Sequence, residues 1–206
     1  MYKPVKRQGE IFMNAYRRLV FFMLLAAGFS AVRSARAQFD AEESHGPRPG
    51  LSVGARAAYY RPKDADHGDL AEGAQVRYHL TRRWALEGSA DLRQDVFGGT
   101  KVDVVPLQLS VLIYLMPHGY KVAPYILAGG GWYYTHVYAP TDSYEFRFGP
   151  HAGGGVEFYL DSAWSFDGSY RYLWNEDIHS RDAGHPLGRN FTDKGFMLTA
   201  AVNYSF

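Results

Sequence analysis

The segment 64–69, which reads DADHGD, has acidic and histidine side chains at a spacing that resembles a metal-binding loop. Calcium loops place oxygen ligands at alternate positions. Here Gly68 stands at the fifth position, where a ligand is needed, and Gln75 stands at the twelfth, where such loops close on a glutamate. We therefore interpret 64–69 as an exposed acidic loop, with loose binding of divalent ions as the alternative.

A second candidate is the polar segment 175–193, which holds His179, Ser180 and His185 beside several acidic residues. The histidine spacing fits no common zinc signature. A Ser–His hydrolase needs its base and nucleophile within hydrogen-bond reach, whereas neighbours such as His179 and Ser180 point to opposite faces of an extended chain. We expect no catalytic, metal or cofactor-binding residue, and no cofactor.

Composition excludes further classes of function. None of the 206 residues is cysteine, which excludes disulfide scaffolds, thiolate metal sites and cysteine nucleophiles. Glycine triplets at 129–131 and 153–155 lack the spacing and the following helix of a phosphate loop. A mean hydropathy of −0.29 argues against a membrane protein with several spanning helices.

The elements that must position these residues alternate in polarity. In the segment 84–93, Trp84 and Leu86 share one face of a strand, whereas Glu87 and Asp91 share the other. The same period of two predicts eight strands, at 51–60, 70–80, 84–93, 102–116, 122–137, 144–160, 164–174 and 196–206. Helical periodicity is nearly absent from this part of the chain.

The connections alternate between short turns, at 81–83, 117–121 and 161–163, and longer polar loops, at 61–69, 95–101 and 175–193. An even strand count with this alternation predicts an all-β fold, an eight-stranded antiparallel up-and-down transmembrane β-barrel. Strands of about 10 residues at about 3.3 Å each, tilted near 45°, also match the roughly 25 Å apolar band. The link 139–143 is short, and its long flanking strands predict a projecting hairpin.

Nine charged residues fall on the polar face of their strands: Arg56, Arg77, Glu87, Asp91, Arg93, Arg147, Glu157, Asp167 and Arg171. A basic residue that faces lipid costs about 2–4 kcal/mol at the midplane. Five arginines on that side would rival the net stability of a domain, about 5–15 kcal/mol. We therefore predict a structural polar network in a plugged lumen. The alternative is a soluble lipocalin-type barrel with an apolar interior, but aromatic residues towards both strand ends favour lipid outside.

Three prolines conflict with this prediction, because a closed barrel has no free edge for a residue without an amide donor. We expect Pro106 and Pro124 near strand ends, and Pro150 at a bulge or above the membrane.

Residues 1–37 have the features of an export signal. Arg17 and Arg18 precede an apolar run that is too short to span a membrane, and Ala35-Arg36-Ala37 resembles a cleavage site. An anchored N-terminal helix is the alternative, because Arg33 and Arg36 are unusual next to a cleavage site. The true start is Met1 or Met13. Cleavage after Ala37 removes seven basic residues and one acidic residue, so the formal charge changes from +1 to −5. A mildly acidic exported domain is unsuited to nucleic acid. The predicted organisation is a signal peptide (1–37), a short periplasmic segment (38–50) and a barrel (51–206).

Three stretches resemble the small outer-membrane β-barrel family, the broad group related to the OmpA, OmpX and OmpW barrel domains. They are the final strand FMLTAAVNYSF, which ends at Phe206, the run APY at 123–125 leading into the glycines at 129–131, and GGGVEF at 153–158 followed by WSF and YRY. The resemblance covers residues 51–206. It implies that Phe206 belongs to the signal read by the barrel-assembly machinery of a Gram-negative bacterium.

The same resemblance implies few further details of function. We expect a structural, envelope-stabilising or surface-interacting protein of the cell outer membrane, with lipid and lipopolysaccharide around it and a surface ligand that the sequence does not identify. Passage of small apolar solutes is one alternative. Another is lipid A hydrolysis, but barrel deacylases carry a His-x-Ser-Asn motif late in the barrel, and the comparable stretch here, 170–177, reads YRYLWNED.

Overall fold

The computed structural model describes residues 48–97, 100–116, 120–137, 143–178 and 192–206. They form eight strands: β1 (Gly50–Pro62), β2 (Asp69–His79), β3 (Trp84–Phe97), β4 (Thr100–Tyr114), β5 (Val122–Val137), β6 (Ser143–Tyr159), β7 (Trp164–Trp174) and β8 (Lys194–Ser205). Within these residues no helix is long and apolar enough to cross a membrane. The predicted signal peptide lies outside the described residues.

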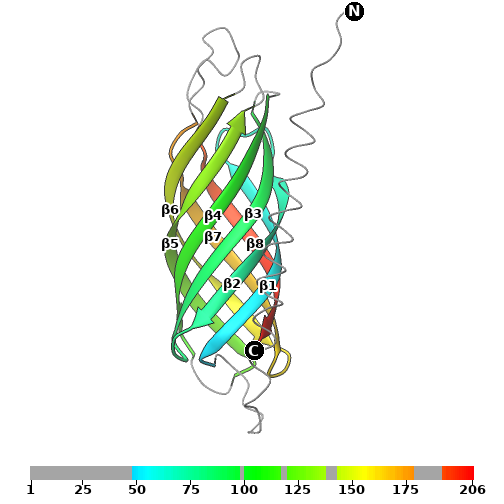
Figure 1. Cartoon of the computed structure of the whole chain (residues 1–206), viewed down its shortest axis with the longest axis vertical. Coiled ribbons are helices and arrows are strands. Elements are labelled where there is room, and N and C mark those ends of the chain that lie inside the picture. The colour runs from blue at the N-terminus through cyan, green and yellow to red at the C-terminus, as the bar shows by residue number, and fades with distance from the viewer. Residues whose placement is uncertain (1–47, 98–99, 117–119, 138–142, 179–191) are drawn as a thin grey trace, which may run out of the picture. The chain divides into compact units, whose positions relative to one another are not determined.

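The strands close into one antiparallel barrel in which each strand pairs with its sequence neighbours and β1 pairs with β8 (Figure 1). The predicted all-β, eight-stranded architecture is therefore confirmed. The first residue of β1 and the last of β8 lie at the end of the barrel that carries the short turns. Strand pairing continues into segments predicted as loops, because β3 reaches Phe97 and pairs Asp95 with Val102.

Side chains alternate between a buried lumen and an exposed outer wall. In β7, Ser165, Asp167 and Arg171 are buried, whereas Phe166 and Tyr170 are about half exposed. The pattern recurs in the other strands, because successive side chains of a strand point to opposite faces. The end of β5 departs from it, since Thr135, His136 and Val137 are all buried. A shift of one residue in register would exchange these two faces, so the alternation strongly constrains the pairing.

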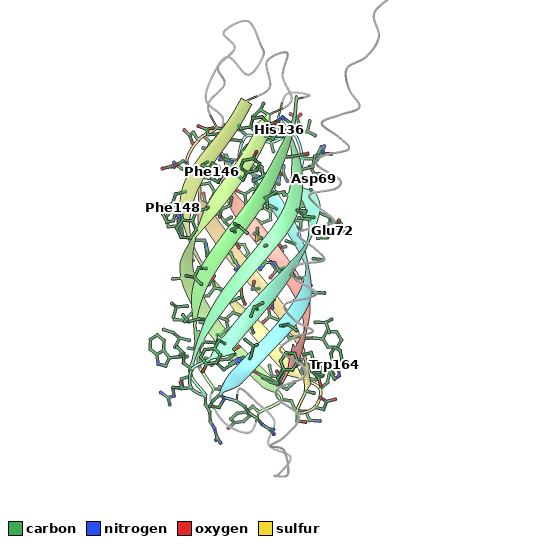
Figure 2. The ribbon with its side chains drawn as sticks, in the orientation of Figure 1. Asp69, Glu72, His136, Phe146, Phe148 and Trp164 are labelled. Atoms are coloured by element: carbon green, nitrogen blue, oxygen red, sulfur yellow. The ribbon has the colours of Figure 1, made fainter. Side chains whose placement is uncertain are left out.

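Aromatic side chains on the outer wall gather towards both ends of the barrel. Trp164 lies near the end with the short turns, and Phe146 and Phe148 lie near the other end (Figure 2). The eleven residues from Trp164 to Trp174 cover about 23 Å along the barrel axis at a tilt near 45°. That height matches the apolar band of outer-membrane barrels.

β5 and β6 exceed this band. They contain 16 and 17 residues, which correspond to about 35 Å of height at the same tilt. Tyr134 of β5 packs against Tyr144 and Phe146 of β6, with ring centroids 6.0 Å and 5.1 Å apart. The extra length therefore adds aromatic contacts between β5 and β6 at that end of the barrel.

The prolines are accommodated in three ways. Pro124 is the third residue of β5 and lies near a strand end, as predicted. Pro106 lies in the middle of β4, so the prediction of a strand-end position is wrong, and the pairing of β3 with β4 is interrupted at that point. Pro150 pairs with Gly130 without a bulge, just beyond His151, where the ladder between β6 and β7 ends. Each missing donor thus coincides with an interrupted or finished ladder or with a strand end.

The glycine triplets lie within strands. A Cβ atom at Gly153 would collide with the backbone of Tyr170 and Arg171, and one at Gly155 would collide with the ring of Tyr125. These positions therefore require glycine because the neighbouring strand and a lumen tyrosine approach closely.

Candidate functional site

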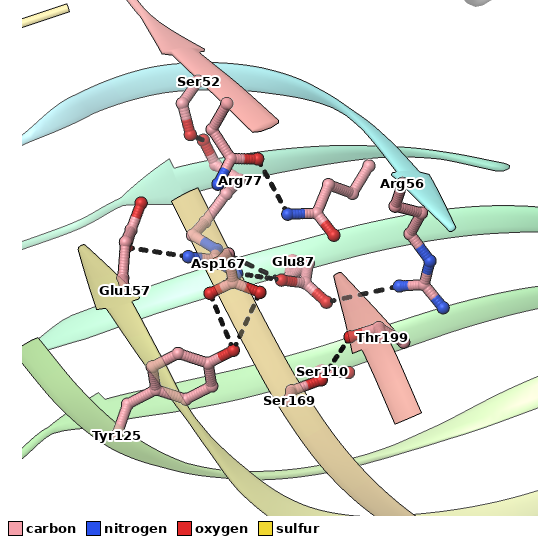
Figure 3. Close-up of polar contacts among 12 residues, drawn as sticks. Ser52, Arg56, Arg77, Glu87, Ser110, Tyr125, Glu157, Asp167, Ser169 and Thr199 are labelled. Carbon is pink, nitrogen blue, oxygen red and sulfur yellow. Dashed lines mark hydrogen bonds and ion pairs between the residues drawn. The ribbon is translucent and has the colours of Figure 1, made fainter. Parts of the chain in front are cut away.

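All nine charged residues predicted for the lumen are buried there, with at most 4% of each exposed: Arg56, Arg77, Glu87, Asp91, Arg93, Arg147, Glu157, Asp167 and Arg171. They come from β1, β2, β3, β6 and β7, and they divide into two groups by their contacts. The first group is centred on Glu87, and Figure 3 labels Arg56, Arg77, Glu87, Glu157 and Asp167 among its members. We call this group the central network, and it consists of Arg56, Arg77, Glu87, Asp91, Glu157, Asp167 and Arg171.

Glu87 of β3 is the centre of this network. Its Oε2 accepts a hydrogen bond from Nη2 of Arg77 at 2.6 Å, and its Oε1 accepts one from Nη2 of Arg171, also at 2.6 Å. Nη1 of Arg56 lies 3.9 Å from Oε1. One carboxylate therefore joins guanidinium groups from β1, β2 and β7 across the lumen.

Arg77 connects this centre to the opposite wall. Its Nη1 donates to Glu157 at 2.8 Å and its Nη2 donates to Asp167 at 3.2 Å. The guanidinium also lies 5.4 Å from the ring centroid of Tyr125. Because Arg77 is fully buried, these contacts replace the water that the charge would otherwise require.

Hydroxyl groups donate further hydrogen bonds to the acidic side chains. Glu157 accepts hydrogen bonds from the hydroxyls of Tyr114, Tyr159 and Ser165 at 2.5, 2.9 and 2.6 Å. Asp167 accepts from Tyr125 at 2.8 Å. Arg56 forms a bidentate pair with Asp91, with both contacts at 2.7 Å. Such bidentate, charge-assisted bonds are the strongest and most directional in proteins.

The second group lies nearer the end of the lumen opposite the short turns, and we call it the upper cluster. Asp193 accepts from Arg147 at 2.8 Å, from Arg93 at 3.1 Å and from the amide of Asn175 at 3.2 Å. Nε of Arg93 also lies 2.7 Å from Asp95, although that contact is not aligned as a hydrogen bond. The upper cluster therefore contains two arginines and two aspartates.

Sequence analysis missed Asp95 and Asp193, which it assigned to polar loops. Both are fully buried. The available signal was parity, since Asp95 continues the lumen-facing series of Glu87, Asp91 and Arg93, and Asp193 stands two residues before the lumen-facing Gly195. The polarity of the surrounding segments masked that signal.

Apolar layers close the lumen on either side of the central network. Leu112, Tyr114 and Tyr125 belong to a buried cluster towards the end with the short turns. Tyr60, Tyr133 and Ile178 belong to another towards the opposite end. Ala65, from the loop after β1, packs against this second cluster. The lumen is thus a filled core.

The acidic segment 64–69 is held by local contacts. Asp64 Oδ2 accepts the backbone N–H of Thr192 at 2.9 Å, and the N–H of Asp66 donates to the carbonyl of Val96 at 3.1 Å. His67 lies 3.2 Å from Asp69. Among the described residues, no group of three or more acidic or histidine side chains is arranged to hold a metal ion. His179 and Ser180 lie outside the described residues.

One Ser–His pair occurs inside the barrel. Ser110 Oγ and His151 Nε2 are 2.8 Å apart, which is the distance of a nucleophile and its base. Both residues are at most 2% exposed, and Nδ1 of His151 has no hydrogen-bond partner in the described part of the chain. The pair therefore lacks the third group that orients a catalytic histidine. It is also enclosed in the lumen, out of contact with solvent.

Comparisons with known proteins agree with this geometry. A family model described as the outer membrane protein beta-barrel domain matches residues 21–206. Solved structures with similar folds include OprG from Pseudomonas aeruginosa (15% identity, 78% of this chain, 98% of that chain, TM-score 0.60). Another is Neisserial surface protein A (16% identity, 76% of this chain, 97% of that chain, TM-score 0.58). A third is the N-terminal barrel of Pseudomonas aeruginosa OprF (16% identity, 80% of this chain, 100% of that chain, TM-score 0.54). No curated protein sequence matches the chain significantly.

Proposed function

Because this chain belongs to the outer membrane protein β-barrel domain family and resides in the outer membrane, we propose that it is a non-catalytic barrel with a structural, envelope-stabilising or surface-interacting role. The observation that carries this proposal is the filled lumen. Arg77, Glu87 and Arg171 are completely buried at its centre, where a pore or substrate site would need water or a ligand.

The proposal assigns the nine lumen charges a structural role. A buried charge is tolerated only when it is paired and hydrogen-bonded, and Glu87, Glu157 and Asp167 each accept at least two hydrogen bonds from lumen side chains. The network thereby links strands that are not neighbours in the barrel. It supports a stiff wall that presents the extracellular loops.

The rival hypothesis of a lipid A hydrolase is tested by the mass of lipid A. We expect lipid A extracted from cells that overproduce the protein to have an unchanged mass, because the described Ser–His pair is enclosed in the lumen. A loss of acyl chains that disappears in S110A or H151A would contradict the proposal. Equally, a loss that disappears only in H179A or S180A would place an active site in the segment 179–191.

The same purified protein tests the proposed processing. We expect the mature chain to begin at Gln38, after removal of the predicted signal peptide. Intact-mass measurement checks this position, and a chain that retains residues 1–37 would contradict it.

A second candidate function, lateral passage of small apolar solutes, is supported by one observation. The ladder between β3 and β4 pairs Ala90 with Leu107 and resumes at Arg93 with Val104. Asp91 and Leu92 pair with β2 on their other side but have no partner in β4, opposite Pro106 and Val105. A closed lumen does not prevent a solute from entering through the wall at such an interruption. Uptake of an apolar dye into liposomes that contain the protein would test this candidate.

A further inference from the structure

Three basic residues meet on the outer wall at the extracellular end of the seam between β1 and β8. Arg61 pairs with Phe196, and the backbone N–H of Lys63 donates to the carbonyl of Lys194 at 2.8 Å. All three basic side chains are exposed. Residues more than 130 positions apart in the sequence therefore form one basic patch, defined here as Arg61, Lys63 and Lys194.

The basic patch has no internal neutralisation in the described part of the chain. No described carboxylate forms an ion pair with Arg61, Lys63 or Lys194. The neighbouring Asp64 uses Oδ2 to accept the N–H of Thr192. Like charges on neighbouring strands destabilise a sheet unless a counter-ion is present. The arrangement contrasts with the lumen, where each of the five arginines forms an ion pair with an acid.

An apolar wall lies directly below the basic patch. Lys194 pairs with Trp174, and Phe196 pairs with Tyr172. The ring of Phe196 stacks on Tyr170 with centroids 6.3 Å apart, and Leu198, further down the same face, is about half exposed. The patch therefore lies where the acyl-facing wall gives way to the lipid headgroups, a position that suits both an aromatic belt and basic side chains.

We propose that the basic patch binds the phosphate groups of lipid A, the membrane anchor of lipopolysaccharide. That lipid forms the outer leaflet of the outer membrane, and it carries its phosphates on sugars directly above its acyl chains. Arg61 offers a planar fork for phosphate oxygens, and the two lysines add mobile positive charges. The acyl chains lie against Phe196, Tyr170 and Leu198, while the phosphates neutralise the basic patch.

Binding of bisphosphorylated lipid A to the full-length protein, purified in detergent, tests this proposal. We expect the triple variant R61Q/K63Q/K194Q to bind on the order of 10- to 100-fold more weakly than wild type, since each basic residue near an anionic lipid contributes a few-fold in affinity. The same lipid A with its phosphates removed should bind wild type and variant alike. Heat-dependent gel mobility verifies that every variant is folded.

A matched control removes three exposed basic residues at the periplasmic end, in the variant R82Q/R83Q/K121Q. This variant loses the same charge but should keep the affinity of wild type for bisphosphorylated lipid A. Equal affinities for wild type and R61Q/K63Q/K194Q would overturn the proposal. An equal loss in the control variant would also overturn it, because it would reveal a general effect of net charge.

Discussion

At the scale of single residues, the main feature is that ionised side chains fill the centre of a small barrel. A buried ion pair is weak evidence for stability, because desolvation offsets much of its attraction. Removing one partner is costly, however, since the other charge stays buried. Glu87 contacts three arginines, so its loss removes a shared counter-ion from all three. We infer that the network makes any shifted register unfavourable, because a one-residue slip would turn these charges towards lipid.

The variant E87Q tests the importance of this centre. We expect it to lower the free energy of unfolding by about 3–5 kcal/mol, because Arg77 and Arg171 lose their shared counter-ion. The measurement is the urea midpoint of the folded band in heat-dependent gel mobility. The control E72Q removes an exposed carboxylate from the outer wall (Figure 2) and should change the midpoint little. Identical midpoints for E87Q and wild type would contradict the role of the network.

Phe206 remains a proposed assembly signal, and it too acts at the scale of one residue. It follows the last residue of β8 and is only partly buried. We expect F206A to reduce the amount of folded protein in the outer membrane of cells several-fold while leaving refolding in detergent unchanged. The control is F166A, which also removes a phenyl ring, but from the outer wall of β7. Normal accumulation of F206A in cells would argue against the signal.

At the scale of strands, length and ladder continuity vary around the barrel. β2 and β7 have 11 residues each, close to the minimum that spans the apolar band, whereas β5 and β6 extend well beyond it. The ladder is continuous between β5 and β6 but is interrupted between β3 and β4 at Pro106. The longest uninterrupted ladder therefore lies between β5 and β6, and a local gap lies between β3 and β4.

The variant P106V tests the interruption. Valine restores an amide donor to β4 at nearly the same volume, so we expect slower hydrogen exchange at Asp91 and Leu92 and a barrel at least as stable as wild type. Pro124 provides the comparison, since P124V lies near the end of β5 and should leave exchange at these residues unchanged. If apolar solutes pass through the interruption, P106V should also slow dye uptake into liposomes. Unchanged exchange in P106V would show that proline does not cause the gap.

At the scale of the whole molecule, the lumen is layered. Apolar clusters lie on either side of the polar centre, and Ala65 and Ile178 pack in the cluster at the end opposite the short turns. An eight-stranded barrel is just wide enough for its own side chains. This packing gives the barrel a filled lumen and an exposed apolar outer wall, with the basic patch at the end opposite the short turns.

This layering predicts the absence of ion conduction. We expect planar bilayers that contain the purified protein to show no discrete conductance steps, because Arg77, Glu87 and Arg171 obstruct the axis. Replacing all three side chains, in R77S/E87S/R171S, removes the obstruction and provides a positive comparison if the variant folds. Regular conductance steps from the wild-type protein would refute a plugged lumen.

The sequence alone determined the number of strands, the side of the wall on which nine of the lumen charges lie and the export signal expected at the start. These are local properties, because the direction of a side chain along a strand depends only on parity. The same alternation places Asp95 and Asp193 in the lumen, although both lie in polar segments of the sequence. The position of Pro106 was predicted wrongly because local sequence does not reveal how long a ladder continues.

Only the tertiary structure decided which charges meet. Arg77 contacts Glu157 and Asp167, which lie 80 and 90 positions later in the chain, and Lys63 reaches Lys194 at the seam. These partners depend on closure of the barrel and on the stagger between neighbouring strands. The stagger accumulates over all eight strand pairings, so no single segment of the sequence reveals it. The periodicity of the chain therefore gave two faces, and closure of the barrel turned one of them into a charged core and the other into a surface for lipid.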